Sequence, residues 1–298
     1  MDIDITGARI LISKPEWGGF MLTETVVVTW IVMLVLVLAC RFMTAHLEVH
    51  PTKKRQVIAE WIVTSIRDMV QTNMGEKYAQ TWYVPFIGAM FALSAGCSLS
   101  SVVGAYAPTS DLSTVLGWAL FVFALITITK IKTNGFGGYL LSFTTPIPVM
   151  TPFNIIGEIA TPVSMAFRHF GNIAGGGVIT TLIYTSLSLA SAAVLNLISA
   201  NGPVASIVLL VVGAALLVWR KKKPSVAKLI FGILCAVLGV FGLLEAFDIL
   251  SGVPVLAYGI PAVLSCYFDL FSGFVQAYVF TLLTMVYISN ALPEPQAA

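Results

Sequence analysis

Long apolar runs separated by short polar segments dominate the chain. Each is about as long as the roughly 20 residues that an α-helix needs to cross the hydrocarbon core of a bilayer. The predicted spans are residues 22–40, 82–104, 115–130 and 154–199, two stretches within 200–260, and residues 262–292. We therefore predict an all-α polytopic membrane protein with about seven spans, in which residues 1–298 form a single membrane domain.

Residues 56–72 have a different pattern, because charged residues interrupt their apolar positions. The apolar side chains recur at helical spacing, at Val57, Ile58, Trp61, Ile62, Ile66 and Met69. Glu60, Arg67 and Asp68 carry charge between them. This pattern predicts an amphipathic helix that lies at the membrane interface.

Basic residues follow alternate spans and set the expected orientation. Arg41 and residues 53–55 follow the first span, and Lys130 and Lys132 follow the third. The longest basic cluster, residues 220–223, separates the two stretches of the 200–260 region. Because positive charge marks the cytoplasmic side, the N-terminus is expected outside and the C-terminus in the cytoplasm.

The segment 154–199 is too long for one straight crossing of the membrane. It predicts either a strongly tilted or bent helix or two separate pieces. The stretch GFGGYLLSFTTPIPVMTP before it is rich in glycine and proline, which suits a broken or re-entrant backbone. The final segment, 262–292, is also longer than a straight crossing requires, so a second tilted helix is expected there.

Composition narrows the class of protein further. Hydrophobic residues make up 58% of the chain and charged residues 10%, whereas an ordinary soluble domain is roughly a quarter charged. A net charge of +2 gives no basic surface for nucleic acid. The four cysteines are isolated and show no spacing typical of a zinc site or redox pair, so no metal or cofactor is expected. The N-terminal residues lack the features of a signal or transit peptide, which favours a bacterial inner membrane.

Four ionisable residues stand within apolar segments: Glu158, Arg168, His169 and Asp269. Such groups are unfavourable by a few kcal/mol or more at membrane depth, and they therefore indicate function. Arg168 is the clearest case, because an arginine keeps its proton at any working pH. The alternative interpretation is a structural ion pair that joins two helices.

Polar residues near Arg168 form one stripe along the predicted helix. Ser164, Arg168, Asn172 and Gly175 follow one another at intervals of three and four residues. The run of small residues at 171 and 174–177 permits close approach of another helix.

In the last helix, Asp269 and Gln276 also share a face, so the two polar faces can meet. The topology places Glu158 up to roughly 15 Å nearer the cytoplasm than Arg168, and Asp269 up to roughly 10 Å nearer the outside than Gln276. An acid on each side of a central cation is what two offset half-channels require.

Two segments resemble the signature helices of the a subunits of F-type ATP synthases: NIIGEIATPVSMAFRHFGNIAGG from Asn154 and GFVQAYVFTLLTMVYISNAL from Gly273. PTSDL at 108–112 and KIKTNGFGGYL from Lys130 are also similar to the family. The resemblance covers most of the chain outside roughly 200–260. It implies an Fo subunit that performs no bond chemistry and conducts an ion, for which a proton is expected and sodium is the alternative.

The resemblance also implies partners and roles. The two long tilted helices would face a ring of c subunits, and the complex would include a b-subunit stalk and other ATP synthase subunits. Arg168 matches the family's essential arginine, which displaces the ion from each arriving c-subunit carboxylate and blocks leakage between half-channels. Asn172 and Gln276 match the polar positions that flank this arginine. Glu158 matches the acid of the inner half-channel and Asp269 a position in the outer one.

The chain departs from the family pattern at three places. Gly177 stands where some relatives have an acid or histidine, and His169 stands where leucine is usual. One helical step turns His169 off the Arg168 stripe, so packing or placement at an interface is favoured over proton relay. The region 200–260 adds two spans, with Glu245 and Asp248 expected at the outer interface.

Two other functions are compatible with parts of the pattern. A secondary transporter would use Arg168 to bind an anionic substrate at the midplane, but the sequence has no obvious inverted repeat. A membrane-embedded enzyme is less favoured, because no paired carboxylates, metal-ligand spacing or nucleophile–base set occurs in the sequence.

A topology reporter tests the orientation. A reporter fused near Lys222 is expected to read as cytoplasmic, because this link carries the longest basic cluster of the chain. An external reading would overturn the seven-span arrangement.

Overall fold

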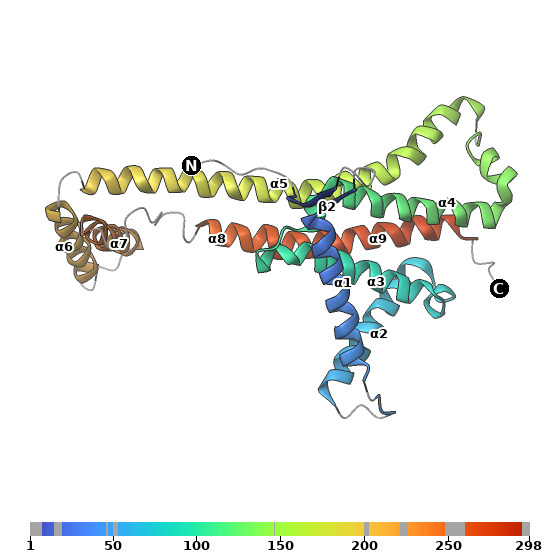
Figure 1. Ribbon diagram of the computed structural model, residues 1–298, viewed down its shortest axis with the longest axis horizontal. Helices are drawn as coiled ribbons and strands as arrows, with labels where there is room; N and C mark the ends of the chain where they lie inside the picture. The colour runs from blue at the N-terminus through green and yellow to red at the C-terminus, as the bar shows by residue number, and fades with distance from the viewer. Residues whose placement is uncertain are drawn as a thin grey trace. The chain divides into compact units, whose positions relative to one another are not determined.

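The computed structural model describes residues 8–14, 20–45, 47–49, 53–145, 147–199, 203–220, 226–247 and 260–293. Figure 1 shows the chain as a set of long helices. By its internal contacts the chain divides into two compact units, one of residues 1–3 and Val178–Ser265 and the other of Asp4–Gly177 and Cys266–Ala298. Each unit is built around its own helix contacts.

The larger unit begins with a short hairpin that the sequence patterns did not predict. Its strands are β1 (Ile10–Lys14) and β2 (Phe20–Thr23), which pair antiparallel. Three helices follow: α1 (Glu24–Met43), α2 (Lys54–Met74) and α3 (Tyr83–Leu99). Single turns of 3₁₀-helix lie at Tyr78–Gln80, Ser100–Val103 and Pro108–Ser110.

The first half of α5 (Thr151–Ser199), α4 (Leu112–Ser142) and α9 (Gly273–Ala291) complete this unit, and α9 packs against α2, α3 and α4. The core consists of apolar side chains at helical spacing. The buried members are Val70, Met74, Tyr83, Ile87, Val115, Ala119, Val122, Ile126, Met165, Ala166, Phe280, Met285, Ile288 and Ala291. Since α9 contacts α2, α3 and α4 and contributes four of these side chains, it is the central helix of the core.

Six of the described helices are long and apolar enough to cross a membrane, and α6 (Pro203–Arg220) is a shorter apolar helix. Together they confirm the prediction of an all-α polytopic membrane protein with about seven spans. The amphipathic segment predicted at 56–72 is helix α2, with Trp61 and Val57 exposed. Its placement at the membrane interface remains a prediction.

Helix α4 begins at a side-chain cap and contains one break. The Asp111 carboxylate accepts hydrogen bonds from the Ser113 amide and hydroxyl, which satisfies an amide of the first turn. Thr25 of α1 donates to the same carboxylate at 3.2 Å. Gly135 has φ 74°, a conformation that favours glycine, and it bends the chain before Tyr139. The helix thus continues well past the predicted end of the third span at residue 130.

Helix α5 is a single helix of 49 residues, so the segment 154–199 does not split into two helices. Pro162 lies inside it. Proline has no amide hydrogen, so the helical hydrogen bond to the carbonyl of Glu158, four residues earlier, cannot form. The carbonyl of Glu158 is thereby left without its usual helical donor.

The smaller unit contains a helical hairpin of α6 and α7 (Val226–Ala246), which are in extensive contact. A Cβ atom on Gly213 would lie 2.7 Å from the Ala236 amide nitrogen and 2.9 Å from the Gly232 carbonyl oxygen. Glycine is required there because the two backbones touch. Lys228 lies 4.7 Å from the Trp219 ring centroid. Lys221–Lys223 of the predicted cytoplasmic link, and Asp248, lie outside the described residues.

The last predicted helix, 262–292, consists of three parts. These are α8 (Ile260–Ser265), a π-helical segment (Cys266–Ser272) and α9. A π-helix widens the turn by one residue, is rare, and occurs frequently at functional sites. Asp269 lies in this segment.

Candidate ion-translocation site

Arg168 lies on an exposed face of α5. Ser164 and Asn172, one turn before and after it, are exposed on the same stripe, and Phe167 beside it is 55% exposed. Among the described residues, no ion pair or hydrogen bond involves Arg168. The interpretation of Arg168 as a structural cation that joins two helices therefore finds no intrachain partner in the described part of the chain.

The opposite face of α5 is buried in the core. His169, adjacent to Arg168, is 0% exposed, and Met165 and Ala166 are also buried. Its ring makes edge contacts with Trp118 of α4 and Phe280 of α9, with centroids 6.4 and 5.5 Å apart. Neither ring nitrogen has a hydrogen-bond partner among the described residues. This surrounding agrees with the packing interpretation of His169.

The polar faces of α5 and α9 meet beyond Arg168. The Asn172 side-chain amide donates a hydrogen bond to the Gln276 side-chain oxygen at 2.6 Å. Gln276 is 4% exposed, so this bond ties a buried amide to the exposed arginine stripe. One turn further, a Cβ atom on Gly176 would lie 2.7 Å from the Phe268 ring, so a larger residue there would displace that ring.

Asp269 is one residue from Phe268, in the π-helical segment. It is partly buried, and no hydrogen bond or ion pair involves it among the described residues. Asp269 thus lies just before α9, next to the residue that contacts Gly176, and its carboxylate does not neutralise Arg168.

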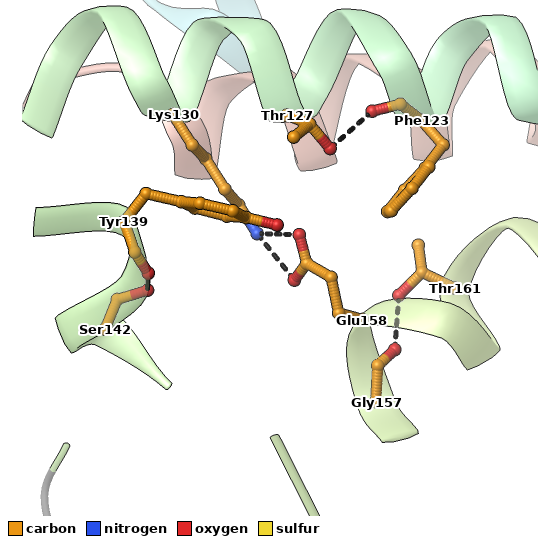
Figure 2. A network of polar contacts seen from close by, with 8 residues as sticks. All are labelled: Phe123, Thr127, Lys130, Tyr139, Ser142, Gly157, Glu158 and Thr161. Carbon is orange, nitrogen blue, oxygen red and sulfur yellow. Dashed lines mark hydrogen bonds and ion pairs between the residues drawn. The ribbon is translucent and has the colours of Figure 1, made fainter. Parts of the chain in front are cut away.

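Glu158 forms a close ion pair that the sequence interpretation missed. The Lys130 ammonium of α4 lies 2.8 Å from each carboxylate oxygen of Glu158. Figure 2 shows the pair between α4 and α5, with the Tyr139 ring beside it. The signal was present, because the positive-inside rule and the helix rise place an acid and a base on the same side of the membrane.

A cavity of about 140 Å³ lies at this pair. Its lining comes from three helices: Phe123, Ile126 and Lys130 from α4, Glu158 and Thr161 from α5, and Tyr287 and Asn290 from α9. The side chains of Lys130 and Glu158 are 28% and 19% exposed. The pair is therefore accessible from the cavity while most of its surface is covered.

These features define a class: a polytopic membrane protein with a fixed cation on an exposed face of a long apolar helix, and with acids at other positions along the helix pair. Among the described residues no group of three or more histidine, cysteine or acidic side chains is placed to hold a metal ion. Such an arrangement suits movement of an ion more than bond chemistry.

The chain belongs to the ATP synthase A chain family, whose sequence profile matches residues 26–219. It is 39% identical over 170 residues to ATP synthase subunit a 2 of Acaryochloris marina, covering 56% of this chain and 72% of that protein. It is 36% identical over 197 residues to ATP synthase subunit a 1 of Crocosphaera subtropica, covering 65% and 84%. The sodium ion specific ATP synthase subunit a of Propionigenium modestum is 28% identical over 294 residues, covering 93% and 77%.

This membership confirms the predicted resemblance to the a subunits of F-type ATP synthases, and the profile match includes the first signature segment from Asn154. The chain is an ion-conducting, non-catalytic subunit of the Fo sector and acts within the ATP synthase complex in a membrane. The comparisons give no support to the alternative of a secondary transporter.

The buried position of His169 leads to a prediction about packing. His169→Leu is expected to keep ion pumping and to keep or raise the thermal stability of the complex, because leucine leaves no ring nitrogen unsatisfied; a buried polar group without a partner is unfavourable by about 1–3 kcal/mol. His169→Ala is expected to lower stability by roughly 2–4 kcal/mol, because it leaves a cavity between Trp118 and Phe280.

Thermal inactivation of ATP-driven pumping by the purified complex measures both changes. Loss of pumping in a fully assembled His169→Leu complex would show that the imidazole takes part in ion transfer.

Proposed function

We propose that the chain conducts protons through two offset half-channels and that Arg168 separates them, so that ion flow turns a c-subunit ring coupled to ATP synthesis. Sodium is the alternative ion. One relative is named sodium ion specific, and the ion-binding carboxylates of the proposed ring would decide between the two. The conduit is otherwise the same for both cations.

The exposed, unpaired position of Arg168 is the observation that carries this proposal. A permanent cation in lipid is unfavourable by at least a few kcal/mol unless a counter-charge or water reaches it. The described residues of this chain supply no carboxylate to it, so a carboxylate from another chain is expected to face it. A ring that presents one carboxylate after another meets this requirement, and a fixed cation acts on each carboxylate without proton transfer.

The two acids fit separate half-channels. Glu158 lies ten residues before Arg168 on α5, roughly 15 Å along the helix, and borders a cavity. Asp269 lies in the π-helical segment that leads into α9. Neither acid pairs with Arg168 among the described residues, which supports routes that approach the arginine from different positions.

Asn172, Gln276 and Ser164 are assigned to the surface around the arginine. The Asn172–Gln276 bond holds α5 and α9 together beside Arg168, and Ser164 lies one turn away on the exposed stripe. We propose that this stripe faces the c ring. A b-subunit stalk, other ATP synthase subunits and lipid would cover other faces, in a bacterial inner membrane with the N-terminus outside and the C-terminus cytoplasmic.

Arg168→Ala tests the proposal directly. The variant is expected to lose coupled ATP-driven pumping in vesicles, by roughly a hundredfold or more, because a preorganised charge at the site of ion transfer is removed. Arg67→Ala, which removes an exposed arginine from α2, is the matched control and is expected to keep coupling. ATP hydrolysis by the catalytic head verifies assembly, and wild-type coupling in Arg168→Ala would refute the assignment.

Asp269→Asn tests the outer half-channel. Pumping is expected to slow by roughly threefold to tenfold, because a proton acceptor is lost. No leak is expected, because Arg168 still separates the half-channels. Asp68→Asn on the exposed face of α2 is the control. Pumping rates equal to those of the control would remove Asp269 from the ion path.

A further inference from the structure

The cavity beside Glu158 has the polar groups of a cation site, and the Lys130 ammonium already occupies the position at the carboxylate. Its polar lining residues besides Lys130 are Glu158, Thr161, Tyr287 and Asn290, whose side chains carry a carboxylate, two hydroxyls and an amide. The Thr161 hydroxyl donates to the Gly157 carbonyl, so its lone pairs remain available as acceptors. Carboxylate, hydroxyl and amide oxygens are ligands for hard cations, and the carboxylate also binds a proton.

Lys130 occupies the place where such a cation would bind. Its ammonium is 2.8 Å from both carboxylate oxygens of Glu158, so it holds the two together and leaves neither oxygen uncontacted. An ammonium is a compact point charge on a flexible stem, and it can leave and return without losing its own proton. The ammonium therefore takes the position of a monovalent cation at the carboxylate while it stays covalently attached to α4.

The backbone near the pair is suited to such an exchange. Pro162 removes the helical donor to the Glu158 carbonyl, which leaves an additional oxygen without its usual partner on the turn that carries the carboxylate. The bend at Gly135 returns the chain so that Tyr139 lies beside the pair (Figure 2). Within the described part of the chain, the titratable groups near Glu158 are Lys130 and Tyr139 of α4, which lie beside it, and Tyr287 of α9, which lines the same cavity.

We propose that Lys130 competes with the transported cation for the Glu158 carboxylate. Its ammonium binds this carboxylate between transport events and thereby speeds release of the ion from the inner half-channel. Lys130 is a positioning residue in this scheme, because it acts through Glu158. An entering cation displaces the ammonium, and the returning ammonium expels the cation. The inference rests on the proposed role of Glu158 in the inner half-channel.

The experiment uses the whole ATP synthase in proteoliposomes with the catalytic head outward, so that the medium sets the ion concentration at the cytoplasmic side. The initial rate of ATP-driven pumping is measured against medium pH and, at fixed pH, against medium sodium. Lys130→Gln is expected to lower the half-saturating concentration of the transported ion by about tenfold, the scale of a hydrogen bond to a charged group. ATP synthesis, which releases the ion to this side, is expected to be inhibited at a correspondingly lower ion concentration.

Matched variants separate this effect from a general loss of charge. Lys132→Gln removes a lysine two residues away that is exposed and has no ion pair among the described residues, and it is expected to behave like the wild type. Lys130→Arg keeps the positive charge and is expected to restore the wild-type concentration dependence. In the double variant Lys130→Gln/Glu158→Gln the shift is expected to disappear, because the contested carboxylate is gone.

Glu158→Asp provides a second route if Lys130→Gln does not assemble. It shortens the acid by one methylene group and weakens the pair while keeping both charges, so a shift in the same direction is expected. An unchanged half-saturating concentration in an assembled Lys130→Gln or Glu158→Asp complex would overturn the inference. The proposed function fails separately, if Arg168→Ala measured in the same vesicles remains coupled.

Discussion

The arrangement of the larger unit depends on the permanent positive charge of Arg168. Arginine keeps its proton at any working pH, and lipid does not solvate it, so its environment must be supplied by the protein and its partners. In the described residues Arg168 has no intrachain counter-ion. The nearest acid on its own helix, Glu158, is instead paired with Lys130. An internal base thus neutralises this acid, and among the described residues Arg168 is left without a carboxylate.

The helices around Arg168 are held by contacts that leave it uncovered. The Asn172–Gln276 hydrogen bond joins α5 to α9, and the contact of Gly176 with Phe268 joins α5 to the π-helical segment before α9. Within a membrane, such polar bonds and close backbone contacts replace the hydrophobic driving force that joins helices in water. They lie beside the arginine stripe and not across it. The proposed role of this exposed stripe, contact with a ring of c subunits, is consistent with membership of the ATP synthase A chain family.

Local pattern was sufficient to predict the membrane helices, because apolar length is a property of the sequence alone. It also singled out Arg168 as a charge within an apolar segment, and its role stays a prediction. It also predicted that His169 is turned off the Arg168 stripe, and in the structure His169 is buried while Arg168 is exposed. The pattern placed Lys130 and Glu158 on the same side of the membrane, but it did not predict their pairing, because that depends on how α4 lies against α5. It also missed the continuation of α4 to Ser142, because the glycine-rich stretch was interpreted as a broken or re-entrant backbone. The π-helical segment was also missed, since one extra residue in a turn leaves no clear mark in hydrophobic periodicity.

The aromatic packing of His169 has a consequence for the neighbouring arginine. Successive residues of an α-helix are about 100° apart around its axis, so fixing the direction of one side chain fixes that of the next. Trp118 and Phe280 hold the imidazole between them. They therefore set the rotational register of α5, and with it the direction in which the guanidinium leaves the helix. A change of shape inside the core would rotate the cation at the surface without altering a single charge.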